Sequence, residues 1–128
     1  ADFFANPSID ASSHVITDAD GNSARCVADH RKAWTCVNFN SASLNIEQCG
    51  RAAQASWPQA QIEETARWIA QWSRAFQIPI QRGAVNGSTV TQKGVVTHSQ
   101  LGAAGGGHSD PGAQFPLDRC LELDRRFR

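Results

Sequence analysis

Two histidines and an aspartate lie close together in the last third of this chain. The stretch Gly94–Pro116 contains His98, His108 and Asp110 within thirteen positions, and three consecutive glycines, Gly105–Gly107, lie between the histidines. Glycine accepts backbone angles that other residues avoid, so this loop can fold back and bring the three side chains together. Histidine nitrogen and carboxylate oxygen are zinc ligands, and a catalytic zinc usually has three protein ligands and one position open to water. A plain glycine-rich loop that ends in an Asp-Pro-Gly turn would show the same pattern, and a metal site would need a further ligand from elsewhere.

A glutamate on a predicted strand is the candidate proton carrier. Residues Ser43–Cys49 alternate as a strand does, with Leu44, Ile46 and Gln48 on one face and Glu47 on the other. If the second face lines a cleft, burial would raise the pKa of Glu47 and fit it to move a proton. The alternative is an ordinary exposed glutamate on a strand.

Two further side chains are candidate contacts for a ligand. His14 lies in the strand-like run Ser12–Thr17, where it could bind zinc, contact a substrate or be a hydrogen-bonded core residue. Trp34 lies in the aromatic segment Ala33–Phe39 and could be part of the core or the wall of a substrate groove.

The elements that hold these residues can be read from hydrophobic period and turn signals. The runs Ser12–Thr17 and Ala24–Ala28 flank Asp20-Gly21, which predicts an antiparallel hairpin. A helix is predicted over Trp57–Phe76, because Ser56 can cap it and Gln59 follows three residues later. Its apolar stripe comprises Ile62, Ala66, Ile69, Ser73 and Phe76, flanked by Trp68 and Trp72, which we expect in the core.

The sequence predicts helical structure at both ends of the chain and a strand just before His98. Residues Gln81–Gln92 predict a loop, which leads into the β-branched run Val95–Thr97 that ends at His98. Residues Leu117–Arg128 predict a terminal helix, and Ala1–Ala5 resembles the end of a helix whose beginning is missing. We therefore expect an α/β fold in a single domain, residues 1–128, with a mixed sheet, the long helix on one face and the C-terminal helix on another.

Composition excludes some classes of function. The chain has 128 residues with 12 basic and 12 acidic side chains, so its formal net charge is zero, which argues against a nucleic-acid partner. No apolar run approaches the ~20 residues that span a membrane, so no membrane partner is expected.

The cysteines allow more than one interpretation. Cys26, Cys36, Cys49 and Cys120 form no Cys-x-x-Cys pair, so a zinc ribbon is not expected. The even number permits two disulfides, and buried free thiols are equally compatible with it. We expect at least one bridge, as would suit an enzyme that works outside a reducing cytosol.

Taken together, the segments resemble the type 2 N-acetylmuramoyl-L-alanine amidases, zinc peptidoglycan hydrolases that share a fold with peptidoglycan recognition proteins. The resemblance runs through five sequences in order: SSHVITDADG, KAWTC, NSASLNIEQCG, SWPQAQIEETARWIA, and GVVTHSQLG followed by HSDPGAQFP. It covers nearly the whole chain and is closest in character to bacteriophage or actinobacterial cell-wall lysins.

The resemblance implies a role for each candidate residue. His98 and Asp110 would bind zinc, and Glu47 would activate the metal-bound water. His108 stands where the family places a polar group that stabilises the oxyanion, and His14 and Trp34 match positions near the substrate groove.

The chain also departs from the family pattern. The family's first zinc ligand is a histidine at the end of a strand that would precede Ala1, so we expect the domain to be incomplete at its N-terminus, with His14 as a less favoured substitute. Thr35 replaces the usual histidine after Ala-Trp, and Asn45 replaces a glycine.

The expected function is zinc-dependent hydrolysis of the amide between N-acetylmuramic acid and L-alanine of peptidoglycan, leading to cell-wall lysis. The expected location is the cell wall, the periplasm or the extracellular space, and a missing N-terminal segment is a possible partner. A non-catalytic peptidoglycan-binding module of the same fold is the alternative, and a purely structural or partner-binding fragment is the third interpretation.

Overall fold

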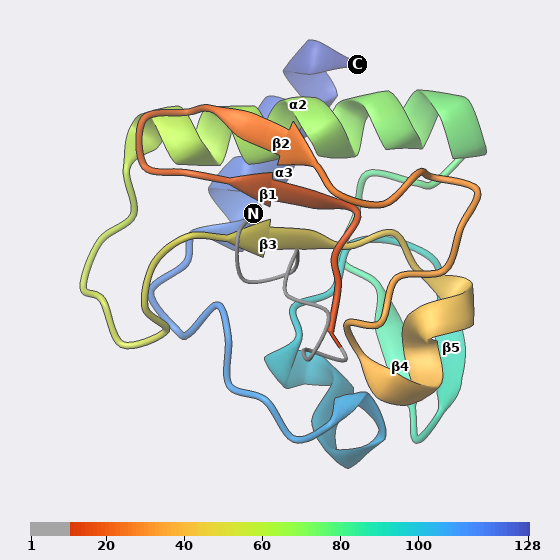
Figure 1. The fold of residues 1–128 in the computed structure, drawn as a ribbon. Coiled ribbons are helices and arrows are strands. Elements are labelled where there is room, and N and C mark those ends of the chain that lie inside the picture. Colours follow the sequence, from red (N-terminus) through yellow and green to blue (C-terminus); the bar gives the residue numbers. More distant parts are fainter. Residues whose placement is uncertain (1–10) are drawn as a thin grey trace.

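A computed structural model describes residues 11–128, so the helix end expected at Ala1–Ala5 lies outside the described residues. The elements in chain order are β1 (Val15–Thr17), β2 (Ser23–Arg25), the 3-10 helix η1 (Val37–Ala42), β3 (Ile46–Gln48), α2 (Gln59–Phe76), β4 (Ala84–Asn86), β5 (Thr89–Gln92), the 3-10 helix η2 (Ser99–Gly105) and α3 (Leu117–Phe127) (Figure 1). None of the described helices is long and apolar enough to cross a membrane.

A small mixed sheet forms one layer of the fold. Its order is β2-β1-β3, with β1 antiparallel to β2 and parallel to β3. The predicted hairpin and mixed sheet are therefore confirmed, although each strand has only three residues. Asp18 closes the hairpin, because its side chain accepts hydrogen bonds from the backbone N–H groups of Asp20 and Asn22.

The long helix lies against this sheet. Helix α2 ends at Phe76 as predicted, where Gln77 adopts a left-handed conformation and its N–H bonds to the carbonyl of Ser73. The predicted cap at Ser56 is wrong: the helix begins two residues later than expected, after Pro58, whose ring already fixes a favourable φ. The buried amide of Gln61 donates to the carbonyls of Thr17 and Cys49 and so ties the helix to the sheet.

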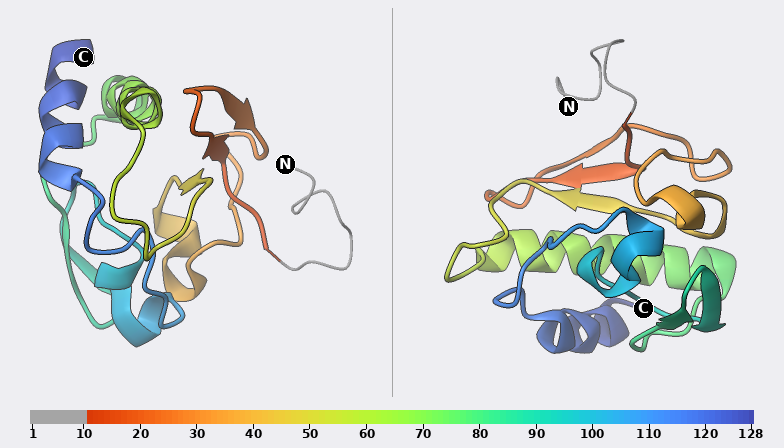
Figure 2. Two further views of the ribbon diagram at one scale, coloured as in Figure 1. Left: turned by 90° about the vertical axis from the view of Figure 1, so that its left-hand side faces the viewer. Right: turned by 90° about the horizontal axis from the view of Figure 1, so that it is seen from below.

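The C-terminal helix packs on α2. Helix α3 forms over the predicted residues, but its predicted place on another face of the sheet is wrong. The strands, α2 and α3 follow one another as three layers (Figure 2). The reason is the shared core, in which Trp57, Ile62 and Ala66 contact the buried Cys120 of α3. As predicted, Cys120 and Leu121 point inward and Phe127 packs at the edge of this core.

Two local predictions before His98 are wrong. The segment Gln81–Gln92, expected to be a loop, contains the β4-β5 hairpin, which turns at Gly87 with φ 58°. The run Val95–Thr97, expected to be a strand, makes only an isolated bridge between Val95 and Arg82. Each segment is too short and too polar on one side for its hydrophobic pattern to decide the outcome.

The expectation of a disulfide is also wrong, because all four cysteines are free. Cys26 and Cys49 follow β2 and β3, which lie on opposite sides of β1, and two strand spacings amount to about 9.6 Å, too far for a bridge. Cys36 and Cys120 belong to separate clusters, one with Phe39 and the other on α3. The buried thiols act as small apolar side chains.

Candidate metal centre and its groove

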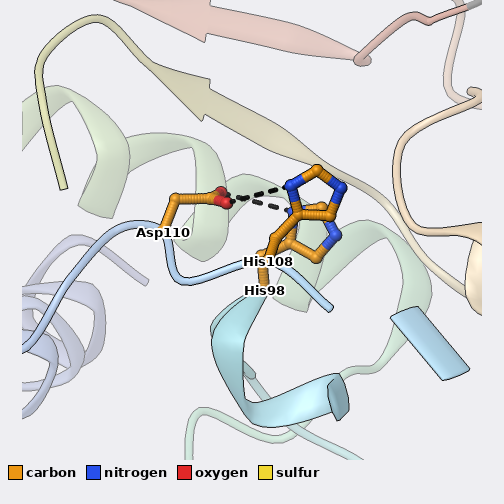
Figure 3. A group of neighbouring side chains, drawn as sticks. All are labelled: His98, His108 and Asp110. Carbon is orange, nitrogen blue, oxygen red and sulfur yellow. Dashed lines mark ion pairs between the residues drawn. The ribbon is translucent and has the colours of Figure 1, made fainter. Parts of the chain in front are cut away.

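His98, His108 and Asp110 converge at the end of the glycine-rich loop (Figure 3). Their ligand atoms all lie within 4.8 Å of one another. His98 Nδ1 is 3.3 Å from Asp110 Oδ2, and His108 Nδ1 is 3.9 Å from Asp110 Oδ1. The two imidazole rings stack with their centroids 4.2 Å apart. The predicted convergence of these side chains is therefore present in the structure, with His108 inside the group.

The hydrogen bonding of His98 leaves one ring nitrogen available as a ligand. Its Nε2 lies 2.7 Å from the carbonyl oxygen of Gly105. A carbonyl only accepts, so Nε2 carries a hydrogen, and Nδ1, which faces Asp110, is the ring nitrogen that can present a lone pair to a metal. A hydrogen bond from the outer ring nitrogen to a backbone carbonyl is typical of metal-binding histidines. These donors fit a zinc ion.

The backbone brings the two ends of the loop together. His98 immediately precedes η2. The sequence had instead predicted that it lies at the end of a strand. The N–H of Ser99 donates to the carbonyl of Asp110 at 3.0 Å, which fixes the carboxylate beside His98. Gly106 has φ 101°, and a Cβ there would lie 3.1 Å from His108 Cδ2. A side chain at this position would be strained and would press on the His108 ring, which favours glycine here.

Glu47 lies on β3 and lines the same groove as the cluster. Burial raises the pKa of Glu47, the negative charge of Asp110 raises it further, and His98 partly offsets both effects. The parallel pairing that places Glu47 opposite Ile16 of β1 fixes its backbone. The electrostatic environment thus favours the protonated form of this carboxyl more than water does, which suits a group that takes up and releases a proton.

The groove beside the cluster is open to solvent and measures about 460 Å³. Its walls include Glu47, His98, His108 and Asp110, and Trp34 stands at the edge with 60% of its surface exposed. The Nζ atom of Lys32 lies 4.3 Å from the centroid of the Trp34 ring, within the range of a cation–π contact. The exposed indole is a flat apolar surface next to the polar cluster.

His14 does not take part in the groove. Its side chain is 1% exposed, it packs edge-on against Trp72, and both ring nitrogens have backbone partners. Nε2 donates to the carbonyl of Arg31 at 2.8 Å, and Nδ1 accepts the N–H of Asn45 at 3.1 Å. The expected substrate contact and the substitute zinc ligand are both corrected here: in this structure His14 is a hydrogen-bonded core residue.

Cys49 and Thr35 also line the groove, although neither was a candidate site residue from the sequence. Cys49 lines it two positions after Glu47 on the same strand face, a placement that strand alternation could have indicated. Thr35 reaches it because its hydroxyl donates to the carbonyl of Ser12, while the Ser12 hydroxyl accepts the N–H of Trp34. No local sequence signal marks this second arrangement, since it depends on contacts between distant segments.

This cluster, glutamate and groove on a mixed α/β fold agree with the comparisons. A profile of the N-acetylmuramoyl-L-alanine amidases matches residues 1–113, and the chain belongs to that family. A relative, N-acetylmuramoyl-L-alanine amidase A of Achromobacter lyticus, is 37% identical over 67 residues. That alignment covers 51% of this chain and 38% of the relative, so the chain spans well under half of that protein. No solved structure matches.

Proposed function

We propose that this chain is a zinc-dependent hydrolase that cleaves the amide between the lactyl group of N-acetylmuramic acid and L-alanine of the peptidoglycan stem. The observation that carries the proposal is the convergence of His98, His108 and Asp110 in one groove with Glu47. Membership of the amidase family supports the substrate class.

His98 and Asp110 are the proposed zinc ligands. When bound, zinc supplies a Lewis acid that polarises the amide carbonyl and lowers the pKa of water towards ~7. His108 has two possible functions, because its Nδ1 lies near Asp110 while its side chain lines the groove and is 56% exposed to solvent. It can complete the ligand set, or it can donate a hydrogen bond to the oxyanion as the family resemblance implies.

Glu47 is the proposed general base and acid. It accepts a proton from the attacking water as oxygen adds to the lactyl carbonyl. It then returns a proton to the departing amine of L-alanine as the C–N bond breaks, which balances the reaction as one water consumed. The raised pKa of Glu47 suits both steps, because a carboxyl that titrates nearer to neutral pH can take and release a proton.

Trp34 is the proposed substrate platform. Its exposed ring stands at the edge of the groove and offers an apolar face on which a sugar or stem peptide can pack. We further propose that the protein acts at the cell wall, where its substrate lies.

The second candidate function is a non-catalytic peptidoglycan-binding module. It is favoured by Thr35 and Asn45, which depart from the family pattern. The Thr35 hydroxyl is engaged with Ser12, and the Asn45 amide donates to Ser43 and contacts the Cys36 sulfur. Both side chains therefore support the local structure. Neither is bonded to His98, His108 or Asp110, so these substitutions leave the proposed metal ligands in place.

The test is digestion of a muropeptide that contains N-acetylmuramic acid and L-alanine, with the products separated by mass spectrometry. We expect the sugar and the stem peptide as separate products, loss of activity with a chelator and recovery with zinc. Muropeptide binding without cleavage would favour the binding module.

A further inference from the structure

Val37, the first residue of η1, has a backbone conformation that its residue type disfavours. Its φ is 51°, and within residues 11–128 Gln77 is the one other non-glycine residue with a positive φ. A side chain that branches at Cβ is an outlier in this region, because its Cβ crowds the following carbonyl oxygen. Gln77 closes the C-terminus of α2, where the left-handed conformation is common. Val37 precedes the helical turn that it begins, so capping does not explain its conformation.

Burial does not compensate Val37 for this strain either. Its side chain is 57% exposed, so it gains little from leaving water. Strained backbone conformations persist where the surrounding structure fixes them, and they cluster at functional sites. The contacts of the valine side chain therefore indicate what the strain maintains.

The residues on both sides of Val37 fix its backbone. The N–H of Cys36 donates to Asn40 Oδ1 at 2.7 Å, and the N–H of Phe39 donates to the carbonyl of Cys36 at 3.1 Å. Cys36 and Phe39 are each 3% exposed and belong to one core cluster with Leu101 of η2. Val37 lies between these anchored residues, so its side chain projects from a fixed place beside η2.

The side chain of Val37 reaches the glycine-rich loop next to His108. The space that a Cβ would fill at Gly106 lies 3.2 Å from Val37 Cγ2. The same space lies 3.1 Å from Cδ2 and 3.2 Å from Nε2 of His108. The Cδ2–Nε2 edge of an imidazole is opposite its Nδ1 atom, and Nδ1 of His108 is the atom near Asp110. Val37 and Gly106 therefore border the edge of the ring that points away from Asp110.

His108 depends on packing more than His98 does. His98 Nε2 donates to the carbonyl of Gly105 at 2.7 Å, which fixes that ring. His108 Nδ1 is 3.9 Å from Asp110 Oδ1, which is longer than a hydrogen bond, and the side chain is 56% exposed. The His108 ring also stacks on the ring of His98, with the centroids 4.2 Å apart (Figure 3). An exposed ring at the end of a glycine-rich loop needs a neighbour on its outer edge to stay in this stack.

We propose that Val37 is a positioning residue for His108. Its branched side chain packs beside Gly106 and prevents the His108 ring from swinging out of the cluster, and the strained backbone is the cost of this contact. Glycine at position 37 would relieve the strain but would leave the outer edge of the ring without this neighbour. The inference rests on the proposed function in one respect, which is that His108 acts in the groove.

The first experiment measures the histidine stack in the protein without metal or substrate. The nuclear Overhauser effect between the ring protons of His98 and His108 reports how closely the rings stay together. Val37→Gly should weaken this effect and raise the melting temperature by roughly 2 °C or more, because the relief of strain exceeds the entropy that glycine adds to the unfolded chain. Val37→Ala should weaken the effect without the gain in melting temperature, since alanine keeps the strain. Val37→Ile keeps the branched side chain and should behave as the parent.

Gln77→Gly is the matched control. It relieves the other positive φ at a residue outside the groove of the metal cluster. It should not lower the melting temperature, and it should leave the histidine stack unchanged. In Val37→Gly either the zinc affinity or the rate of hydrolysis should fall by roughly tenfold, depending on which function His108 has, whereas Gln77→Gly should keep both.

Two results would overturn the proposal. One is an unchanged Overhauser effect between the rings in Val37→Gly. The other is a weakened effect together with a lower melting temperature in that variant, which would show that Val37 only supports the fold. Neither result depends on catalysis. A protein that fails to cleave muropeptides but loses the histidine stack in Val37→Gly would therefore refute the proposed hydrolysis and keep the positioning function of Val37.

Discussion

The Nδ1 atom of His98 lies 3.3 Å from the Oδ2 atom of Asp110, although the two residues are twelve positions apart. Between them, η2 and its glycines reverse the chain, and the Ser99–Asp110 backbone bond closes the loop. The pair therefore depends on backbone geometry, and a side-chain substitution can remove a ligand without destroying the loop.

Removal of the carboxylate should weaken metal binding. We expect Asp110→Asn to lower zinc affinity by at least roughly 10- to 100-fold, because the amide is a neutral and weaker donor. Titration with zinc in competition with a chelator measures the change. Asp118→Asn is the matched control, since Asp118 is 81% exposed and pairs with Arg82 on the surface. Equal zinc affinity of the two variants would remove Asp110 from the site.

Replacement of Glu47 should lower the rate of hydrolysis without changing zinc binding. Glu47→Gln keeps the size of the side chain but cannot accept a proton, so we expect hydrolysis to fall by roughly 10²- to 10⁴-fold. Zinc content should stay the same, because Glu47 is not among the proposed ligands. Glu122→Gln, at a side chain that is 64% exposed on α3, should keep full activity. Parent activity in the Glu47 variant would disprove the assigned function.

The exposed indole should matter for substrate and not for stability. We expect Trp34→Ala to weaken muropeptide binding by about tenfold, equivalent to ~1.4 kcal/mol, while Trp34→Phe keeps most of the affinity. The melting temperature should hardly change, because 60% of the Trp34 surface is exposed. Isothermal titration with a Glu47→Gln background prevents turnover during the measurement. Unchanged affinity in the alanine variant would exclude Trp34 as a platform.

His14, which is buried in the core, should matter for stability and not for zinc binding. His14→Ala leaves the Arg31 carbonyl and the Asn45 N–H without partners and opens a cavity. We expect a loss of about 2 to 4 kcal/mol in the free energy of unfolding, with zinc stoichiometry unchanged. His30→Ala, at an exposed position, is the control for both measurements. A zinc-deficient but stable His14 variant would restore this residue as a ligand.

Sequence patterns predicted the elements whose signals are long or local. The period of α2 extends over eighteen residues, and the Asp20-Gly21 turn follows a strand with a buried face, so both were predicted correctly. The β4-β5 hairpin was missed although Asn86-Gly87 is a turn signal, because its strands are mostly polar and exposed.

The site was only partly predictable, because local spacing can be read from the sequence but contacts between distant segments cannot. Residue types and spacing brought His98, His108 and Asp110 into one hypothesis, and the cluster is present. Burial of His14 could not be read from its own strand, because its partners, Arg31 and Asn45, come from two distant segments. The disulfide expectation failed because the number of cysteines carries no information about the distances between them.

A buried carboxyl on α3 gives the last prediction, which concerns pH. Asp124 is 0% exposed, its Oδ2 atom has no partner among the described residues, and the Cys120 thiol lies 3.9 Å from Oδ1. Burial raises the pKa of Asp124 from 3.8 to about 8, and the Cys120 thiol and the charge of Arg125 only partly offset this effect. The folded protein therefore holds a proton on Asp124 at pH values where the unfolded chain has lost it.

The sign of the stability change follows from this difference in bound protons. Below a pH of 3.8 both states are protonated, and above about 8 both are ionised, so the contribution of Asp124 is constant in each range. Between these values the unfolded state binds fewer protons, so the free energy of unfolding falls as pH rises.

Asp124→Asn imitates the protonated form and abolishes this dependence. We expect the variant to match the parent at about pH 4 and to melt roughly 5 °C or more higher at about pH 8, measured by circular dichroism. Glu122→Gln on the exposed side of the same helix should show no such gain. A melting-temperature difference between the Asp124 variant and the parent that is the same at both pH values would contradict the raised pKa and show that packing alone accounts for the change.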